Sequence, residues 1–417
     1  MTEGKVRTPA TRLSRRAEAA ANDAAVAAIS RGASVAFRLI GDSFDVGLRV
    51  DSGEVSLSKD SHGLDCDFTL TAADDVWEGL TDDEPPAGEH SVVTLVRQGL
   101  VKLSGEQLAY DRHVQIVRAF VDAIREARST APLGRPLTAT GSYHRIETSL
   151  GVTDVYVERQ GSGPQLLACA TAGSQTSQWH GIMTHTDLTD RYELITVDLP
   201  WHGRTSPAWD QPVGSYRLTP DRYTEFLVAV ADALELEAPI LVGVSMGGAA
   251  VVHAIATHPK RFAGAVGCQA GPSVTARANE HLRGTRVNPA LFIPEWTYGL
   301  MNPASPEPFK QRVWWGYSSG GHGLYAADID SYLSWNVDSV QTKLTPELPH
   351  IAILSGVFDT SVPSSASEEL ARRIPNASFR TMPELGHFPH AENPPIFARH
   401  LEAALERVQA GAEGGSL

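Results

Sequence analysis

One short stretch constrains the fold of this chain more than any other. The apolar run 239–244 leads directly into the tetrapeptide 245–248 (Ser-Met-Gly-Gly), and the apolar segment 249–255 follows. This order predicts a buried strand, a sharp turn with a serine at its tip, and a helix. Gly243 and Gly247 flank the serine at positions where larger side chains would clash in so tight a turn. We therefore expect the hydroxyl to be held clear of the backbone at a helix N-terminus.

A serine hydroxyl in such a turn becomes a nucleophile only when a base takes its proton and an acid orients the base. Both partners follow Ser245 in the order acid, then histidine. Asp359 ends a turn after the apolar run 351–354, and His387 follows the predicted strand 378–382. Ser245, Asp359 and His387 are therefore the predicted catalytic triad.

A second histidine, His390, lies three residues beyond His387 and is the alternative base. Gly386 immediately precedes His387. A glycine permits a close approach between the loop and the serine. This neighbour favours His387 over His390.

The composition excludes several classes of function. The net charge is −14, which argues against a nucleic-acid partner because phosphate binding needs a basic surface. The three cysteines, Cys66, Cys169 and Cys268, are far apart and lack metal-site spacing. No apolar run reaches the length of a membrane span, and no signal-peptide pattern is found. We expect a cytoplasmic protein that needs neither a metal nor an organic cofactor.

With 417 residues, the chain is long enough for two domains. Residues 1–130 alternate between apolar and polar positions in several short segments and then show helical spacing, which predicts a smaller α+β domain. Segment 131–142 contains Pro132, Gly134, Pro136 and Gly141 without an apolar period and is the predicted linker. The second domain is expected to span 143–417.

Residues 17–127 resemble the sterol-carrier-protein-2 family. The resemblance rests on the predicted hairpin around 51–53, the helix AADDVWEGL and the strand GLVKLSGE. It implies a sheet covered by helices, with an apolar tunnel for lipids. A module used only for packing or for forming a homodimer remains the alternative.

The second domain has a different pattern. Solid apolar runs at 166–170, 194–197, 240–244 and 351–354 alternate with helical segments. Such runs predict parallel strands that are buried on both faces of a sheet. The predicted fold class is therefore α/β. One intervening helix is expected to start with Thr219 as its N-cap.

Residues 143–409 resemble the α/β-hydrolase superfamily. The resemblance rests on the serine turn, the order of the triad, and the loop 198–205 (Asp-Leu-Pro-Trp-His-Gly-Arg-Thr). It implies a serine hydrolase that cleaves a carboxylic ester or lactone through an acyl-enzyme. In this family His202 is usually a residue that holds the turn.

The chain departs from the family at the oxyanion hole, where the segment 171–175 (Thr-Ala-Gly-Ser-Gln) replaces a common His-Gly pair. The hole needs backbone N–H groups rather than a histidine side chain. Gly173 is retained. The backbone amides of Ser174 and Met246 are therefore the predicted donors.

The insertion at about 270–348 is too long for a plain connection, and the resemblance identifies it as a cap. It contains half of the eight tryptophans. These side chains either form the core of a small lid or line a pocket for an apolar or aromatic small-molecule substrate. The predicted substrate-binding residues are Trp179, Trp314, Trp315 and Trp335.

Other functions share these motifs. A carbon–carbon bond hydrolase of ring-cleavage products, an acyltransferase and a cofactor-free haloperoxidase would show the same triad. A protein that binds a lipid or another small molecule without turnover is the alternative outside enzymes.

Overall fold

The computed structural model of the chain describes residues 11–58, 63–125, 129–275, 282, 286–321 and 323–414. The chain divides into two compact units. The N-terminal unit comprises Met1–Ser129 together with Thr285–Gly299. The C-terminal unit comprises Thr130–Gly284 and Leu300–Leu417.

Five strands of the described residues form the sheet of the N-terminal unit, in the order β3-β2-β1-β4-β5. Their bounds are β1 Val35–Ile40, β2 Asp45–Asp51, β3 Glu54–Ser58, β4 Phe68–Thr71 and β5 Lys102–Gly105. Strands β1 and β4 pair in parallel, whereas the other neighbours are antiparallel. The predicted hairpin joins β2 to β3, where Ser52 and Gly53 have φ angles of 51° and 94°. Two successive left-handed residues form the turn that suits a twisted hairpin.

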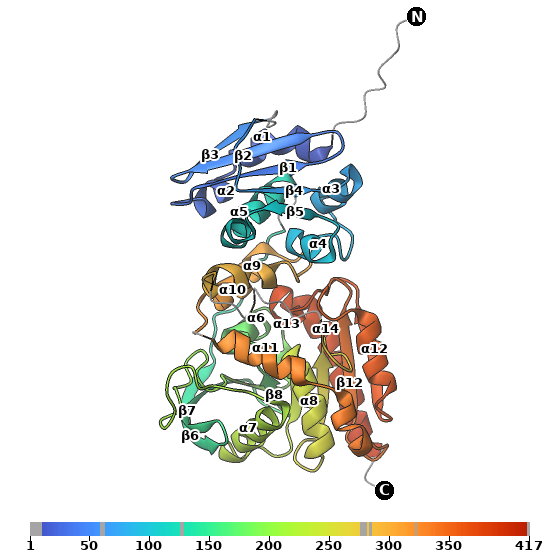
Figure 1. Cartoon of the computed structure of the whole chain (residues 1–417). Coiled ribbons are helices and arrows are strands. Elements are labelled where there is room, and N and C mark those ends of the chain that lie inside the picture. Colours follow the sequence, from blue (N-terminus) through green and yellow to red (C-terminus); the bar gives the residue numbers. More distant parts are fainter. Residues whose placement is uncertain are drawn as a thin grey trace, which may run out of the picture. The chain divides into compact units, whose positions relative to one another are not determined.

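Helices accompany this sheet (Figure 1). They are α1 Arg12–Ala21, α2 Ala24–Ile29, α3 Asp74–Thr81, α4 Val92–Gln98, α5 Gln107–Arg125 and α9 Pro289–Tyr298. Helix α5 buries the stripe predicted from its helical spacing, including Val114, Val117 and Val121. Helix α4 was not predicted, because it is a short segment between two loops.

Helix α9 comes from the segment expected to belong to the cap, yet it is part of the N-terminal unit. The Nε of Arg118, on α5, donates to the Oε2 of Glu295 at 2.5 Å, and the Glu295 side chain is fully buried. The Arg118 guanidinium also lies 4.4 Å from the centre of the Tyr298 ring. Arg97 of α4 stacks on Trp296 in the same way. An ion pair and two cation–π contacts thus fix α9 within this unit.

The described residues of the C-terminal unit form an eight-stranded sheet in the order β13-β12-β11-β10-β8-β9-β7-β6. The bounds are β6 Thr140–Thr148, β7 Gly151–Gln160, β8 Gln165–Cys169, β9 Glu193–Val197, β10 Ile240–Val244, β11 Gly264–Cys268, β12 Ile351–Gly356 and β13 Ala377–Met382. Neighbouring strands from β13 to β9 are parallel, and β7 and β6 are antiparallel additions. The predicted α/β class is confirmed. Strand β6 begins at Thr140, within the segment predicted as linker.

Helices connect these strands. They are η1 Thr176–Trp179, α6 His180–His185, η2 Leu188–Asp190, α7 Pro220–Ala233, α8 Met246–Thr257, α10 Glu307–Ser318, α11 Leu324–Ser334, η4 Val337–Ser339, η5 Gln341–Lys343, α12 Ser364–Arg372, α13 Pro389–Glu392 and α14 Pro394–Gly414. Helix α7 starts as predicted, because the Thr219 side chain accepts a hydrogen bond from the Arg222 amide. In the described part of the chain, no helix is long and apolar enough to span a membrane.

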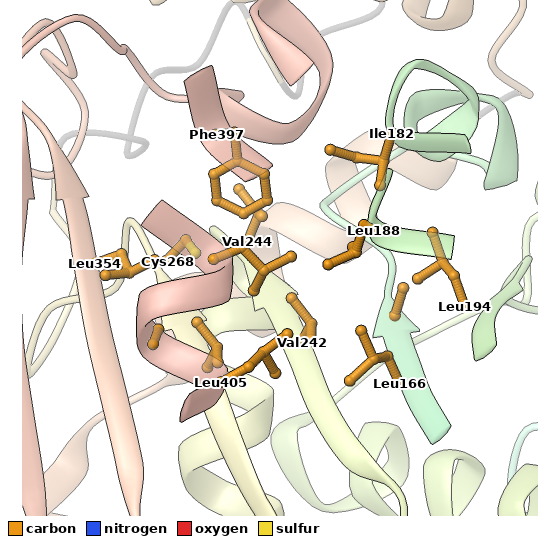
Figure 2. Packing of buried hydrophobic residues seen from close by; sticks show 14 of the residues in the cluster. Leu166, Ile182, Leu188, Leu194, Val242, Val244, Cys268, Leu354, Phe397 and Leu405 are labelled. Carbon is orange, nitrogen blue, oxygen red and sulfur yellow. The ribbon is translucent and has the colours of Figure 1, made fainter. Parts of the chain in front are cut away.

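Figure 2 shows the core on one face of the larger sheet. Val242 and Val244 of β10 pack there with Phe397 and Leu405 of α14. Successive side chains of a strand point to opposite faces. Gly243 therefore faces the other side, where α8 lies against β10. Helices on both faces bury the sheet and leave the ends of its strands to carry the site.

Candidate active site

The turn between β10 and α8 holds Ser245 in a strained conformation. Its φ and ψ angles are 58° and −121°, a region that non-glycine residues rarely adopt. A Cβ atom at Gly243 would overlap the carbonyl oxygen of Gly247, and one at Gly247 would lie 2.8 Å from that of Ala170. Backbone packing therefore requires both glycines, as the sequence predicts.

The three predicted triad residues come together. The Nε2 of His387 lies 2.8 Å from the Oγ of Ser245, and its Nδ1 lies 2.7 Å from the Oδ2 of Asp359. Ser245 is 3% exposed, Asp359 4% and His387 0%. The other carboxylate oxygen of Asp359 accepts from the amides of Ser361 and Val362, at 2.7 and 3.1 Å. With Nδ1–H donating to the carboxylate, the lone pair of Nε2 is directed at the serine hydroxyl and can accept its proton.

The loop before the histidine packs on the backbone that follows α9. The His387 amide donates to the carbonyl oxygen of Leu300 at 2.9 Å. A Cβ atom at Gly386 would overlap that same oxygen and lie 2.9 Å from the Cα of Met301. Gly386 thus allows this contact, rather than the close approach to the serine that we expected from the sequence.

A buried carboxylate that was not predicted holds the same loop. Glu392 is fully buried, and its Oε1 accepts from the amides of Gly386 and Phe388 at 2.9 and 3.1 Å. Its Oε2 accepts from the Asn302 amide at 2.7 Å and from the Ser305 hydroxyl at 3.2 Å. Burial raises the pKa of Glu392 to about 7, against the lowering effect of these hydrogen bonds. The carboxylate thereby joins the backbone on both sides of the histidine to the segment 302–305.

The alternative base, His390, lies in a packed environment. Its Nε2 is 3.3 Å from the Oε1 of Gln178, and its ring is 4.5 Å from that of Trp179. Burial, with a smaller effect of the His387 charge, lowers the pKa of His390 to about 3. His390 therefore stays neutral near neutral pH.

The turn after β8 differs in detail from the predicted oxyanion site. The Ser174 amide donates to the carbonyl oxygen of Thr171 at 3.1 Å, so this predicted donor is engaged within the turn. The Gly173 amide donates to the Oδ2 of Asp328 at 2.7 Å. Within the described residues, the Ala172 amide has no hydrogen-bond acceptor. The Gln175 amide likewise has no acceptor among these residues, but Gln175 is only half-buried, whereas Ala172 is buried.

Asp328, on α11, is the centre of a buried network. Besides the Gly173 amide, it accepts from the Tyr216 hydroxyl at 2.9 Å and lies 3.0 Å from the Nε2 of His202. The Nδ1 of His202 is 2.9 Å from the carbonyl oxygen of Pro200. Burial lowers the pKa of His202, but attraction to Asp328 outweighs it and the net shift is upward. His202 thus holds its own turn, as the resemblance implies, and joins it to α11.

An aromatic group adjoins the histidine. The Phe388 ring lies 4.8 Å from that of His387, and the Tyr317 ring lies 5.6 Å from Phe388. Tyr325 is 5.9 Å from Tyr317, and a Cβ atom at Gly173 would lie 2.6 Å from its ring. These side chains connect the histidine loop, α10 and α11 with the oxyanion turn.

The four tryptophans predicted to bind substrate do not share one environment in the structure. Trp315 is 57% exposed, and Trp314 is half-buried. Trp335 is buried, and its indole N–H donates to the carbonyl oxygen of Gly271 at 2.9 Å. Trp179 is part of the core beneath the sheet. Packing explains Trp335 and Trp179, whereas Tyr317 of α10 and Tyr325 of α11 are aromatic residues of the predicted cap that lie beside the site.

The described residues also bear on metal binding and on thiol chemistry. No group of three or more His, Cys, Asp or Glu side chains in this part of the chain is arranged to hold a metal ion. The thiols of Cys169 and Cys268 are buried next to the elbow, and burial raises the pKa of both. Neither thiol is therefore a reactive group.

Comparison with known proteins identifies the class to which this fold and site belong. The model of the alpha/beta hydrolase family matches residues 166–400. The chain therefore belongs to the alpha/beta hydrolase family.

Similar proteins include a pimeloyl-[acyl-carrier protein] methyl ester esterase of Aeromonas hydrophila, which is 26% identical over 60% of this chain and 98% of its own length. Among solved structures, a thermophilic esterase from Thermogutta terrifontis has a TM-score of 0.55 and 22% identity, and covers 65% of this chain and 99% of its own. An enol-lactonase from Burkholderia xenovorans LB400 has a TM-score of 0.51 and 17% identity, over 61% of this chain and 97% of its own. These structures share the fold.

Proposed function

We propose that this protein is a serine hydrolase that cleaves a carboxylic ester or lactone through an acyl-enzyme. One observation carries the proposal. The hydroxyl of Ser245, the imidazole of His387 and the carboxylate of Asp359 form a continuous buried chain of hydrogen bonds, with distances of 2.8 and 2.7 Å. A strained elbow presents the serine at one end of this chain.

In the proposed mechanism, the Oγ of Ser245 attacks the carbonyl carbon while the Nε2 of His387 takes the serine proton. Asp359 stabilises the imidazolium that forms. The tetrahedral intermediate collapses, and the leaving alkoxide takes the proton from His387. A water molecule then attacks the acyl-enzyme with His387 as base, which releases the acid and restores the serine.

The oxyanion that forms in each half-reaction needs two N–H donors. We assign these to the amides of Met246 and Ala172. Met246 is the first residue of α8, so its N–H has no acceptor within the helix. Of the two amides without an acceptor in the turn described above, that of Ala172 belongs to the buried residue. This assignment keeps Met246 from the sequence prediction and replaces Ser174.

The substrate class rests on the residues beside the histidine. Tyr317, Tyr325 and Phe388 are buried aromatic side chains at or near the triad. Such side chains suit an apolar or aromatic acyl or alkyl group. The similarity to a methyl ester esterase supports ester cleavage.

Covalent labelling with a fluorophosphonate and a screen of activated esters, lactones and vinylogous diketones test the proposal. Ser245→Ala should abolish labelling and lower kcat by roughly 10⁴-fold or more. A matched control is Ser355→Ala, because Ser355 is also fully buried and its hydroxyl donates to that of Ser364. This control should retain labelling and activity. Ligand binding without labelling or turnover would instead identify a binding protein, and preference for the diketones would identify a carbon–carbon bond hydrolase.

For the N-terminal unit, we propose a binding or assembly role without chemistry of its own. Its helices and five-stranded sheet agree with the α+β class that the resemblance to sterol carrier proteins implies. Displacement of a fluorescent fatty acid from the full-length protein tests lipid binding. Light scattering tests whether the unit supports a homodimer instead.

A further inference from the structure

Gln269 directly follows β11, the strand next to the one that carries the serine. It is fully buried and has a φ angle of 55°, although it is not a glycine. Its amide continues the sheet by donating to the carbonyl oxygen of Leu354 at 3.1 Å. The unusual backbone conformation turns the chain at the end of the strand, and the side chain is held inside the protein.

The side-chain amide of Gln269 joins the two loops that carry the acid and the base. Its Oε1 accepts from the Gly356 amide at 3.1 Å, at the end of β12 and three residues before Asp359. Its Nε2 donates to the carbonyl oxygen of Gly386, the residue before His387. Both groups of one planar amide are therefore used, and each is bound to a different loop.

The space around this amide is closed. A Cβ atom at Gly356 would lie 2.7 Å from the Nε2 of Gln269 and would overlap the carbonyl oxygens of Leu385 and Gly386. The backbone carbonyl oxygen of Gln269 accepts from the Tyr332 hydroxyl of α11 at 3.0 Å. The acid turn, the histidine loop and the cap helix thus meet at one residue.

From this geometry we infer that Gln269 is a positioning residue, which sets the separation of Asp359 and His387 by bridging their loops. The inference rests on the proposed function of the triad. The two side-chain hydrogen bonds of Gln269 go to Gly386 and Gly356, so it acts on His387 and Asp359 through these neighbouring residues. Loss of the bridge should loosen the Asp359–His387 hydrogen bond and lower the rate of the chemical step, with little effect on substrate binding.

The test uses one variant that keeps the length of the side chain and one that removes it. Gln269→Met removes both hydrogen bonds, and Gln269→Gly removes them while also relieving the unfavourable φ angle. Both variants should lower kcat by about 10²-fold and leave KM within about twofold, as expected for a misplacement on the order of 1 Å. Equal losses in the two variants would assign the effect to the amide rather than to the backbone.

A readout that does not depend on turnover separates this inference from the proposed function. The Nδ1 proton of His387, bound to the Asp359 carboxylate, should give a downfield proton NMR signal that Asp359→Asn removes. We expect Gln269→Met to shift or broaden this signal, with a changed pKa of His387 in the pH–rate profile. An unchanged signal together with kcat within twofold of wild type would overturn the inference. A wild-type protein that shows the signal but no hydrolysis would contradict the proposed function alone.

Gln160→Met is the matched control. The Nε2 of Gln160, on β7, also donates to a backbone carbonyl oxygen, that of Met183 at 3.0 Å. Strand β7 is three positions from β10 in the sheet. This variant loses a comparable hydrogen bond and should keep kcat and the NMR signal. If Gln269→Met does not fold, Gln269→Glu provides the same test, because its carboxylate keeps the contact with the Gly356 amide and repels the Gly386 carbonyl oxygen.

Discussion

The Nε2 of His387 lies 2.8 Å from the Oγ of Ser245, although 142 residues separate them in the chain. Both side chains are buried, so water competes little for either partner. The distance is short enough for direct proton transfer from the hydroxyl to the imidazole. The same ring is held from its other side by Asp359, which fixes the tautomer that this transfer needs.

We predict that His387, and not His390, is the general base. His387→Ala should lower kcat/KM by several orders of magnitude, whereas His390→Gln should retain most activity. In the wild type, kcat/KM should rise with pH as His387 loses its proton. His390 adds no step near neutral pH, because burial lowers its pKa to about 3. The measurement is the pH–rate profile, and an inactive His390→Gln with an active His387→Ala would exchange the two roles.

Two glycine-to-alanine substitutions, one at the elbow and one in helix α10, should change the free energy of unfolding in opposite directions. Gly243→Ala places a Cβ atom against the Gly247 carbonyl oxygen and should destabilise the protein by about 3 kcal/mol. Gly316→Ala lies in the interior of α10, where the new Cβ meets no atom of the described residues within 4 Å beyond the adjoining turns of its own helix, and should stabilise the protein by about 0.5–1 kcal/mol. Denaturant unfolding of both variants measures the difference. Similar free energies of unfolding would mean that the turn is more open than described.

Glu392 should make stability depend on pH. Its pKa is about 7 in the folded protein and near the ordinary value of 4.5 in the unfolded chain. Between these values the folded state holds a proton that the unfolded state has released, so this group favours folding at low pH and loses that effect as pH rises. Relative to Glu392→Gln, wild-type stability should fall by roughly 3 kcal/mol from pH 4.5 to 7. Parallel stability curves for the two proteins would show that the pKa is not raised.

The ion pair of Arg118 and Glu295 should be sensitive to removal of one partner. Arg118→Met leaves a fully buried carboxylate without its guanidinium and should cost about 3–5 kcal/mol. Adding Glu295→Gln to that variant should recover part of the loss, because the uncompensated charge is gone. Thermal unfolding of the two variants and the wild type provides the comparison. A double variant no more stable than Arg118→Met would assign the cost to lost packing on Tyr298.

Alanine substitutions at Trp335 and Trp315 should differ in their effect on the free energy of unfolding. Trp335→Ala removes a fully packed ring and the hydrogen bond to Gly271, so it should cost about 3–5 kcal/mol. Trp315→Ala, at an exposed position, should change stability by less than about 0.5 kcal/mol.

Tyr317→Leu should lower kcat/KM for bulky aromatic esters more than for an acetate. An equal loss of kcat/KM for both esters would show that the aromatic group of the substrate does not bind against Tyr317.

The sequence predicts the triad because each member has its own local signal. Ser245 lies between close-packed glycines, Asp359 follows a buried strand, and His387 follows the next one. The parallel order of the strands then brings their ends together. Strand β6 lacked such a signal, because it is the edge strand of the sheet and most of its residues are polar or exposed.

Other parts of the site depend on contacts that no local pattern contains. The Ser174 amide cannot serve as a donor to the oxyanion because it already donates to the carbonyl oxygen of Thr171. Helix α10 turns Tyr317 inward, together with Phe309 and Val313, and this spacing of four residues was a usable signal. Gln269 and Glu392 were not predicted, because their partners become neighbours only in the folded chain.

Membership of α9 in the N-terminal unit has a consequence for synthesis on the ribosome. The first 129 residues emerge first, but the helix that pairs Glu295 with Arg118 is made only after Thr130–Gly284. Domains usually fold as they emerge. Here the surface of α5 that receives α9 stays uncovered while residues 130–284 of the second unit are being translated. A protease cut in the segment 129–139 would leave α9 joined covalently to the second unit, and the pairing of Glu295 with Arg118 would then hold the first 129 residues to it.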